Sequence, residues 1–104
     1  MTEGILGEER VIRMKRYRKI REDIMSGRSD KNISEEDMEF FLSKIGATHR
    51  RTKGSHIQYS VDNIPELINI QPKNGKIKPY QVKGIRNIVS KYRLGEGGND
   101  DGIQ

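Results

Sequence analysis

The sequence predicts an α+β fold in which helices cover one face of a three-stranded antiparallel sheet. Three observations support this prediction. Apolar residues recur at helical spacing between residues 33 and 46 and again after residue 78, and polar and apolar residues alternate between these two segments. Short sequences rich in glycine and asparagine separate the expected strands. The order is therefore helix, three strands, helix, with one further helix before them.

The composition bounds the size of the core and the kind of partner. The chain has 104 residues, of which 32% are hydrophobic and 34% charged, so we expect one small domain with a thin core. It contains no cysteine, which excludes disulfides and fits a cytoplasmic protein. No apolar run is long enough for a membrane span or a signal peptide. The net charge of +5 favours an acidic partner such as RNA, DNA or an anionic protein.

Residues 11–26 are expected to form a basic amphipathic helix. Its apolar positions recur at helical spacing: Val11, Met14, Tyr17, Ile20 and Ile24. Three interpretations stay open. The helix packs on the domain and exposes its basic side to solvent, or its basic side binds RNA, or it lies on a membrane surface. Residues 1–10 are expected to be flexible, because Gly4 and Gly7 leave little helical signal there.

The next helix has both ends marked in the sequence. Ser34 is a suitable N-cap, and the acidic residues after it favour the positive end of the helix dipole. Ile33 and Met38 have the spacing of a hydrophobic staple around this cap. An apolar stripe follows, and Gly46 is placed to end the helix in the left-handed conformation.

A hairpin is predicted after this helix, with strands at residues 47–53 and 56–61. Gly54-Ser55 suits a two-residue type II′ turn, because glycine takes the first position. A third strand is expected at 67–71 and a turn at 73–76. The two-residue turn fixes the hairpin register, which pairs Lys53 with His56, Arg51 with Gln58 and His49 with Ser60.

Alternation assigns the two faces of this sheet. Ile57, Tyr59 and Val61 share the face that must meet the helices, so His56 points away from the core. The outer face is expected to collect cations, amides and both histidines, without a carboxylate. Its members are His49, Arg51, Lys53, His56, Gln58, Asn69 and Gln71. A register slip of one residue would scatter this set.

Such a face suits an RNA phosphodiester. Cations neutralise phosphate, amides bind bases or sugar, and an imidazole exchanges a proton near neutral pH. A neutral His56 can take the proton of a ribose 2′-hydroxyl while cations stabilise the transition state. No cluster of carboxylates or histidines has metal-ligand spacing, so neither a metal nor a cofactor is expected. His49 is a second candidate, and a tolerated surface histidine is the alternative for both.

The last helix is expected to begin at Lys78-Pro79, since proline is well tolerated in a first turn. Its buried stripe is Val82, Ile85, Ile88, Val89 and Tyr92. Gly95 is expected to end the helix, and residues 95–104 to form a disordered tail. A single α+β domain is thus predicted at 11–94.

Several stretches together resemble the HicA family of toxin–antitoxin systems over residues 26–94, with the family core at 33–94. They are Gly54-Ser55-His56-Ile57-Gln58-Tyr59, the segment 26–33, Gly46, Ile70-Gln71-Pro72-Lys73 and the segment 78–83. The resemblance implies a fold like that of double-stranded-RNA-binding domains and an endoribonuclease that cleaves mRNA. It also implies a HicB-type antitoxin partner that covers the active site. The catalytic histidine of the family's Gly-Ser-His motif corresponds to His56 here.

The chain departs from the family pattern at two places. Ala47 follows Gly46 where many members have an aromatic residue, and Gln71-Pro72-Lys73 stands where many have a second histidine. One histidine cannot easily be both base and acid in a concerted step, which leaves Arg51, Lys53, Tyr59 or water as the acid.

The sequence also leaves the function class open between three hypotheses. The first is a ribonuclease toxin, the second a non-catalytic RNA-binding module of the same fold, and the third a protein whose basic surface meets an acidic protein. The expected RNA-binding residues are Arg51, Lys53, Ser55, Gln58, Lys73, Lys76, Lys78 and Lys83.

Overall fold

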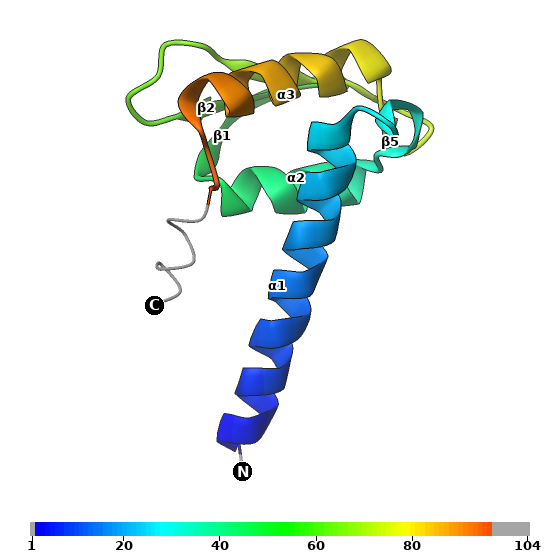
Figure 1. Ribbon diagram of the computed structural model, residues 1–104. Helices are drawn as coiled ribbons and strands as arrows, with labels where there is room; N and C mark the ends of the chain where they lie inside the picture. Colours follow the sequence, from blue (N-terminus) through cyan, green and yellow to red (C-terminus); the bar gives the residue numbers. More distant parts are fainter. Residues whose placement is uncertain (1, 97–104) are drawn as a thin grey trace.

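The structure is a computed structural model that describes the backbone of residues 2–96 and the side chains of residues 7–96. Within these residues it has three α-helices and two small antiparallel sheets (Figure 1), which confirms the predicted α+β class. The elements are α1 (Thr2–Ser26), the 3₁₀ helix η1 (Asp30–Asn32), α2 (Glu35–Lys44), β1 (Ala47–Lys53), β2 (His56–Val61), β3 (Ile68–Ile70), β4 (Pro72–Lys73), β5 (Lys76–Ile77) and α3 (Pro79–Tyr92).

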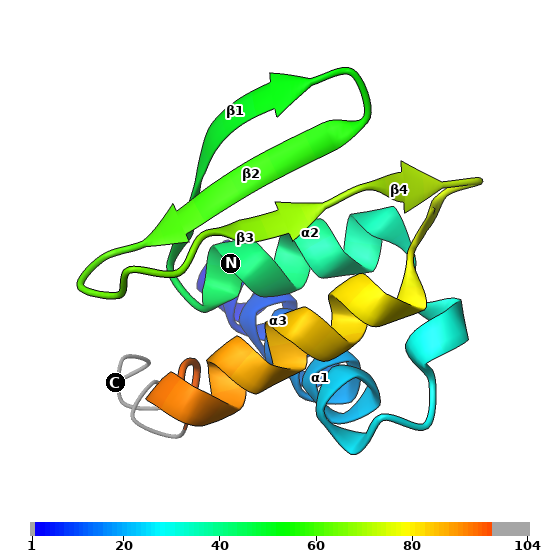
Figure 2. The same cartoon turned by 90° about the horizontal axis from the view of Figure 1, so that it is seen from above.

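Strands β1, β2 and β3 form one antiparallel sheet in that order, with β2 at its centre (Figure 2). Gly54 has a φ of 61°, the left-handed value that the first position of a type II′ turn requires. The turn therefore forms as predicted, and the pairs Lys53–His56 and Arg51–Gln58 are confirmed. On the other side of β2, Gln58 faces Asn69 of β3.

The core lies between this sheet and the helices. Val61 from β2 and Ile68 and Ile70 from β3 are buried there, which confirms the predicted inner face of the sheet. All three helices contribute to the same cluster of buried side chains. Their buried residues are Ile20 and Ile24 of α1, Met38, Phe41 and Leu42 of α2, and Val82, Ile85 and Val89 of α3.

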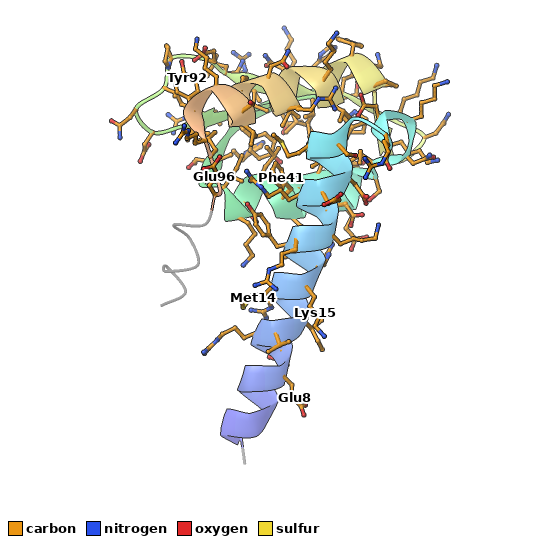
Figure 3. The ribbon with its side chains drawn as sticks, in the orientation of Figure 1. Glu8, Met14, Lys15, Phe41, Tyr92 and Glu96 are labelled. Atoms are coloured by element: carbon orange, nitrogen blue, oxygen red, sulfur yellow. The ribbon has the colours of Figure 1, made fainter. Side chains whose placement is uncertain are left out.

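Helix α1 differs from its prediction in length and in packing. It begins at Thr2 and continues through the segment that was expected to be flexible. Glutamate, arginine and leucine favour a helix, and each glycine costs only about 1 kcal/mol, so the two glycines do not stop it. Its first half projects from the domain (Figures 1 and 3), and Val11, the first of the apolar positions at helical spacing, is 49% exposed. None of the described helices is long and apolar enough to span a membrane.

The ends of α2 follow the sequence signals closely. The Ser34 hydroxyl accepts a hydrogen bond from the Asp37 N–H at 3.0 Å, which confirms the cap. Ile33 and Met38 are both buried, as a hydrophobic staple requires. Gly46 ends the helix with a φ of 92°. These local interactions fix where β1 leaves the helix.

Helix α3 starts as predicted but ends two residues early. Pro79 is its first residue. Arg93, with a φ of 53°, ends the helix in the left-handed conformation, two residues before Gly95. Gly95 is itself held in place, because its carbonyl accepts a hydrogen bond from the Tyr17 hydroxyl at 2.8 Å. Of the predicted tail, Gly95 and Glu96 are described, and residues 97–104 lie outside the described residues.

A second, two-stranded sheet follows β3 and was not predicted. The third strand ends at Ile70, and β4 pairs with β5 through a tight turn at Asn74-Gly75. Both turn residues have positive φ, which is the pattern of a type I′ turn. The predicted turn at 73–76 is thus confirmed, and the residues around it form a short ribbon beside the start of α3.

Candidate functional site

The β1–β2 hairpin presents His56 to solvent. His56 is the first residue of β2 and follows the Gly54-Ser55 turn directly. It pairs with Lys53 across the hairpin, and both side chains are exposed. Ile57, the next residue, packs against the core. His56 therefore points away from the core, on the face that the sequence predicts.

His49 lies on the other face of the sheet, which corrects the prediction. It pairs with Tyr59 instead of Ser60, because β1 contains a bulge between His49 and Arg51. Because of this extra residue, the β1 residues before the bulge lie on the face opposite to the one that the predicted register gives them. The His49 and Tyr59 rings meet edge to face at 5.7 Å between centroids, and His49 Nε2 lies 2.7 Å from the Thr52 hydroxyl. No pattern of alternation marks this bulge in the polar run of β1.

The outer face around His56 is cationic and rich in amides. Arg51 pairs with Gln58, next to the Lys53–His56 pair. The Gln58 amide donates to Asn69 Oδ1 at 3.2 Å, which joins β2 to β3 on this face. This face, in the strand residues that the structure describes, has neither a carboxylate nor a buried charge. It can attract a phosphate and offer hydrogen bonds to the groups attached to it.

Gln71 extends this face towards α3. Continuing the β2–β3 register by one residue brings it opposite His56. Its amide contacts two of the predicted site residues at once, since Nε2 donates to the Ser55 hydroxyl at 3.4 Å and Oε1 accepts from Lys78 Nζ at 3.0 Å. Lys78 is thereby connected through Gln71 to Ser55, the residue directly before His56.

Four lysines line an open depression of about 450 Å³ beside this face. It lies between η1, the β4–β5 ribbon and the start of α3, with Ile77 and Pro79 in its wall. Among the described side chains, no carboxylate forms an ion pair with any of the four. The lysines are Lys31, Lys73, Lys76 and Lys78. We call this depression the lysine pocket.

The structure brings three of the five predicted RNA-binding lysines into this pocket and leaves two outside it, of which Lys53 stays on the hairpin. Lys73, Lys76 and Lys78 line it, whereas Lys83 is exposed on α3 outside it. Lys31 was missed, because it stands in a polar linker without any pattern that ties it to β4 and β5. The segment around Lys31 meets the ribbon through the Ile77 N–H, which donates to the Ile33 carbonyl at 2.9 Å, and through Lys76, which donates to the Asn32 side chain at 3.2 Å.

The basic residues of α1 are partly engaged within the domain. Arg16 pairs with Asp37 at 3.3 Å and lies over the Phe40 ring at 4.1 Å from its centroid. Arg21 donates to the Leu94 carbonyl at 2.9 Å. Lys15 lies farther out, on the projecting half of the helix (Figure 3). The inner half of the helix thus packs on the domain, and the outer half leaves its cations in solvent.

Tyr59, on the face opposite His56, has a perturbed pKa. Burial raises the pKa of the Tyr59 hydroxyl, and the nearby carboxylates of Glu39 and Glu35 raise it further. A raised pKa makes this hydroxyl a poorer proton donor. Among the side chains described here, no group of three histidines or carboxylates comes together as a metal site.

Comparisons with protein families, with curated proteins and with solved structures give no match to this chain.

Proposed function

We propose that this chain is an endoribonuclease that cleaves mRNA without a metal ion and acts as the toxin of a type II toxin–antitoxin system. The observation that carries the proposal is the position of His56. It is exposed on a sheet face whose other side chains are cations and amides, in a chain of net charge +5. An RNA backbone is the polyanion that also brings its own nucleophile to such a histidine, the 2′-hydroxyl.

In the proposed reaction His56 acts as the general base. Its neutral imidazole takes the proton of the 2′-hydroxyl, and the 2′-oxygen then attacks the adjacent phosphorus. Lys53 and Arg51, its neighbours on β1, favour the charge that develops on the phosphoryl oxygens. Gln58 and Asn69 offer amide groups to a base or a sugar. The products carry a 2′,3′-cyclic phosphate and a 5′-hydroxyl.

The resemblance of residues 26–94 to the HicA family supports the same function. The order α2, β1, β2, β3, α3 is the one expected of a double-stranded-RNA-binding domain, so we include that fold in the proposal. A HicB-type antitoxin would neutralise the enzyme by covering the face around His56. Because the substrate is mRNA, the proposed place of action is the cytoplasm.

Expression in a host without the antitoxin tests this function. The wild-type chain should arrest growth, and His56→Ala should not, because the variant lacks the base. His49→Ala is the matched control, since it removes the only other histidine of the chain, which lies on the opposite face. It should arrest growth as the wild type does. Equal growth arrest by a folded His56→Ala variant would remove His56 from the mechanism.

The lysine pocket favours a second candidate, a non-catalytic RNA-binding module of the same fold. Its four cations can follow a phosphate backbone whether or not His56 acts on it. This alternative predicts salt-dependent RNA binding without any strand cleavage during long incubation at high protein concentration. Intact RNA under those conditions would favour the binding module over the ribonuclease.

A further inference from the structure

The proposed reaction needs an acid that protonates the leaving 5′-oxygen. Of the side chains that the sequence leaves open for this role, Tyr59 lies on the face opposite His56, where it contacts His49. Arg51 is on the correct face, but a guanidinium does not release its proton in a protein. A lysine ammonium remains as the proton donor on this face.

Lys78 is the lysine that hydrogen bonds connect to the turn before His56. Its Nζ donates to Gln71 Oε1 at 3.0 Å, and the Nε2 of the same amide donates to the hydroxyl of Ser55 at 3.4 Å. Ser55 is the residue directly before His56. A single amide group thus connects the Lys78 ammonium to the turn that presents the histidine.

Gln71 is itself fixed from both sides. Its backbone N–H donates to Gln81 Oε1 at 2.6 Å, which ties the end of β3 to the first turn of α3. Lys78 is the N-cap of that helix and is partly buried. Lys53, the other lysine on this face, is exposed and makes no hydrogen bond or ion pair among the described side chains. The geometry therefore distinguishes a held ammonium from a free one.

We propose that Lys78 is the general acid that acts opposite His56, and that Gln71 is the residue that positions it. This inference rests on the ribonuclease function proposed above. It assigns the role that the second histidine would have in the HicA-like pattern to a lysine that comes from the start of α3 and is held by Gln71.

The step balances in protons and electrons. His56 takes the 2′-proton while the bond from the 2′-oxygen to phosphorus forms. The bond from phosphorus to the 5′-oxygen breaks, and this oxygen takes a proton from the Lys78 ammonium. The products are a 2′,3′-cyclic phosphate, a 5′-hydroxyl, a protonated His56 and a neutral Lys78, and exchange with water restores both side chains.

A substrate with a 5′-bridging sulfur tests the acid directly. A thiolate leaves without being protonated, because thiols are far stronger acids than alcohols. Lys78→Met should cleave ordinary RNA about 10²-fold more slowly than the wild type, whereas the loss on the sulfur substrate should be less than about tenfold. His56→Ala should lose activity on both substrates, since the base is still needed. Lys44→Met, which removes an exposed lysine at the end of α2, should behave as the wild type on both.

Three results would overturn the assignment of the acid. An equal loss on both substrates would mean that Lys78 only binds RNA. If the sulfur substrate restored the activity of Lys53→Met and not that of Lys78→Met, the acid would be Lys53. A wild-type chain that cleaves neither substrate would refute the ribonuclease function itself, a result distinct from the other two because it involves no variant.

The positioning role of Gln71 has its own test. Gln71→Ala keeps the backbone N–H that binds Gln81 and removes only the amide that holds Lys78. It should slow cleavage of ordinary RNA less than Lys78→Met does, and sulfur should rescue it as well. The double variant should be no slower than Lys78→Met alone, because Gln71 acts through Lys78. If the rate loss of the double variant equalled the product of the two single losses, Gln71 would act independently of Lys78. That result would overturn its positioning role.

Discussion

The two histidines of this chain lie on opposite faces of one hairpin, and a single extra residue in β1 is the cause. The bulge between His49 and Arg51 keeps Arg51 opposite Gln58 while it shifts His49 to Tyr59. Alternation in β2 predicts the side of His56 correctly, because Ile57 and Val61 are apolar and mark the inner face. Strand β1 has no apolar residue after Ala47, so nothing in its sequence reveals where the alternation is broken.

At the same scale, substitution of two exposed glycines by alanine should change the stability of the domain in opposite directions. Gly54→Ala should destabilise the domain by about 1 kcal/mol or more, because an alanine at φ 61° is strained. Gly84→Ala should stabilise it by up to about 1 kcal/mol, because Gly84 lies inside α3 and a Cβ there meets no atom within 4 Å. Denaturant unfolding of both variants checks this. Stabilisation by Gly54→Ala would contradict the turn on which the position of His56 depends.

At the scale of elements, those with local start and stop signals were predictable, and those that depend on long-range contacts were not. Helix α2 has its cap, staple and terminal glycine within 14 residues of sequence, and each acts as expected. The β4–β5 ribbon was missed because its strands have only two residues each. The cluster of Gln71, Ser55 and Lys78 forms only when the end of β3 meets α3, so sequence spacing alone could not show it.

The hydrogen bond between Tyr17 of α1 and Gly95, which follows α3, gives a prediction at this scale. The Tyr17 hydroxyl donates to the Gly95 carbonyl and accepts from Arg21 at 3.1 Å, while the ring stacks on Phe41. Tyr17→Phe keeps the ring and removes both hydrogen bonds, so it should lower the free energy of unfolding by about 1 kcal/mol. Thermal or urea unfolding measures the change. An unchanged stability would mean that this tie does not hold α1 to the domain.

At the scale of the whole molecule, the excess of positive charge is unevenly available to a ligand. Arg16 and Lys19 of α1 are paired with Asp37 and Asp23. The lysine pocket and the outer sheet face have cations that no described carboxylate neutralises, and both border Gln71 and Lys78. The sequence shows the net charge of +5, but only the fold shows where the described cations lack a carboxylate partner.

This distribution predicts which lysines contribute to the salt dependence of RNA binding. Lys76→Met should reduce the slope of log binding constant against log salt by about 0.7 for single-stranded RNA, since one phosphate contact is lost. Lys19→Met is the matched control, because Lys19 is paired with Asp23 at 3.0 Å on α1. Its slope should equal that of the wild type. A larger effect from Lys19 than from Lys76 would place the RNA on α1 instead of the lysine pocket.

The most direct test of the central claim is the cleavage of RNA by the purified chain, followed by identification of the new ends. We expect the wild type and His49→Ala to cleave in the presence of EDTA and to leave 2′,3′-cyclic phosphate and 5′-hydroxyl ends. His56→Ala, folded as the wild type, should be at least about 10²-fold slower, since it lacks the general base. Cleavage by His56→Ala at the wild-type rate, or ends with a 5′-phosphate, would contradict a reaction in which His56 activates the 2′-hydroxyl.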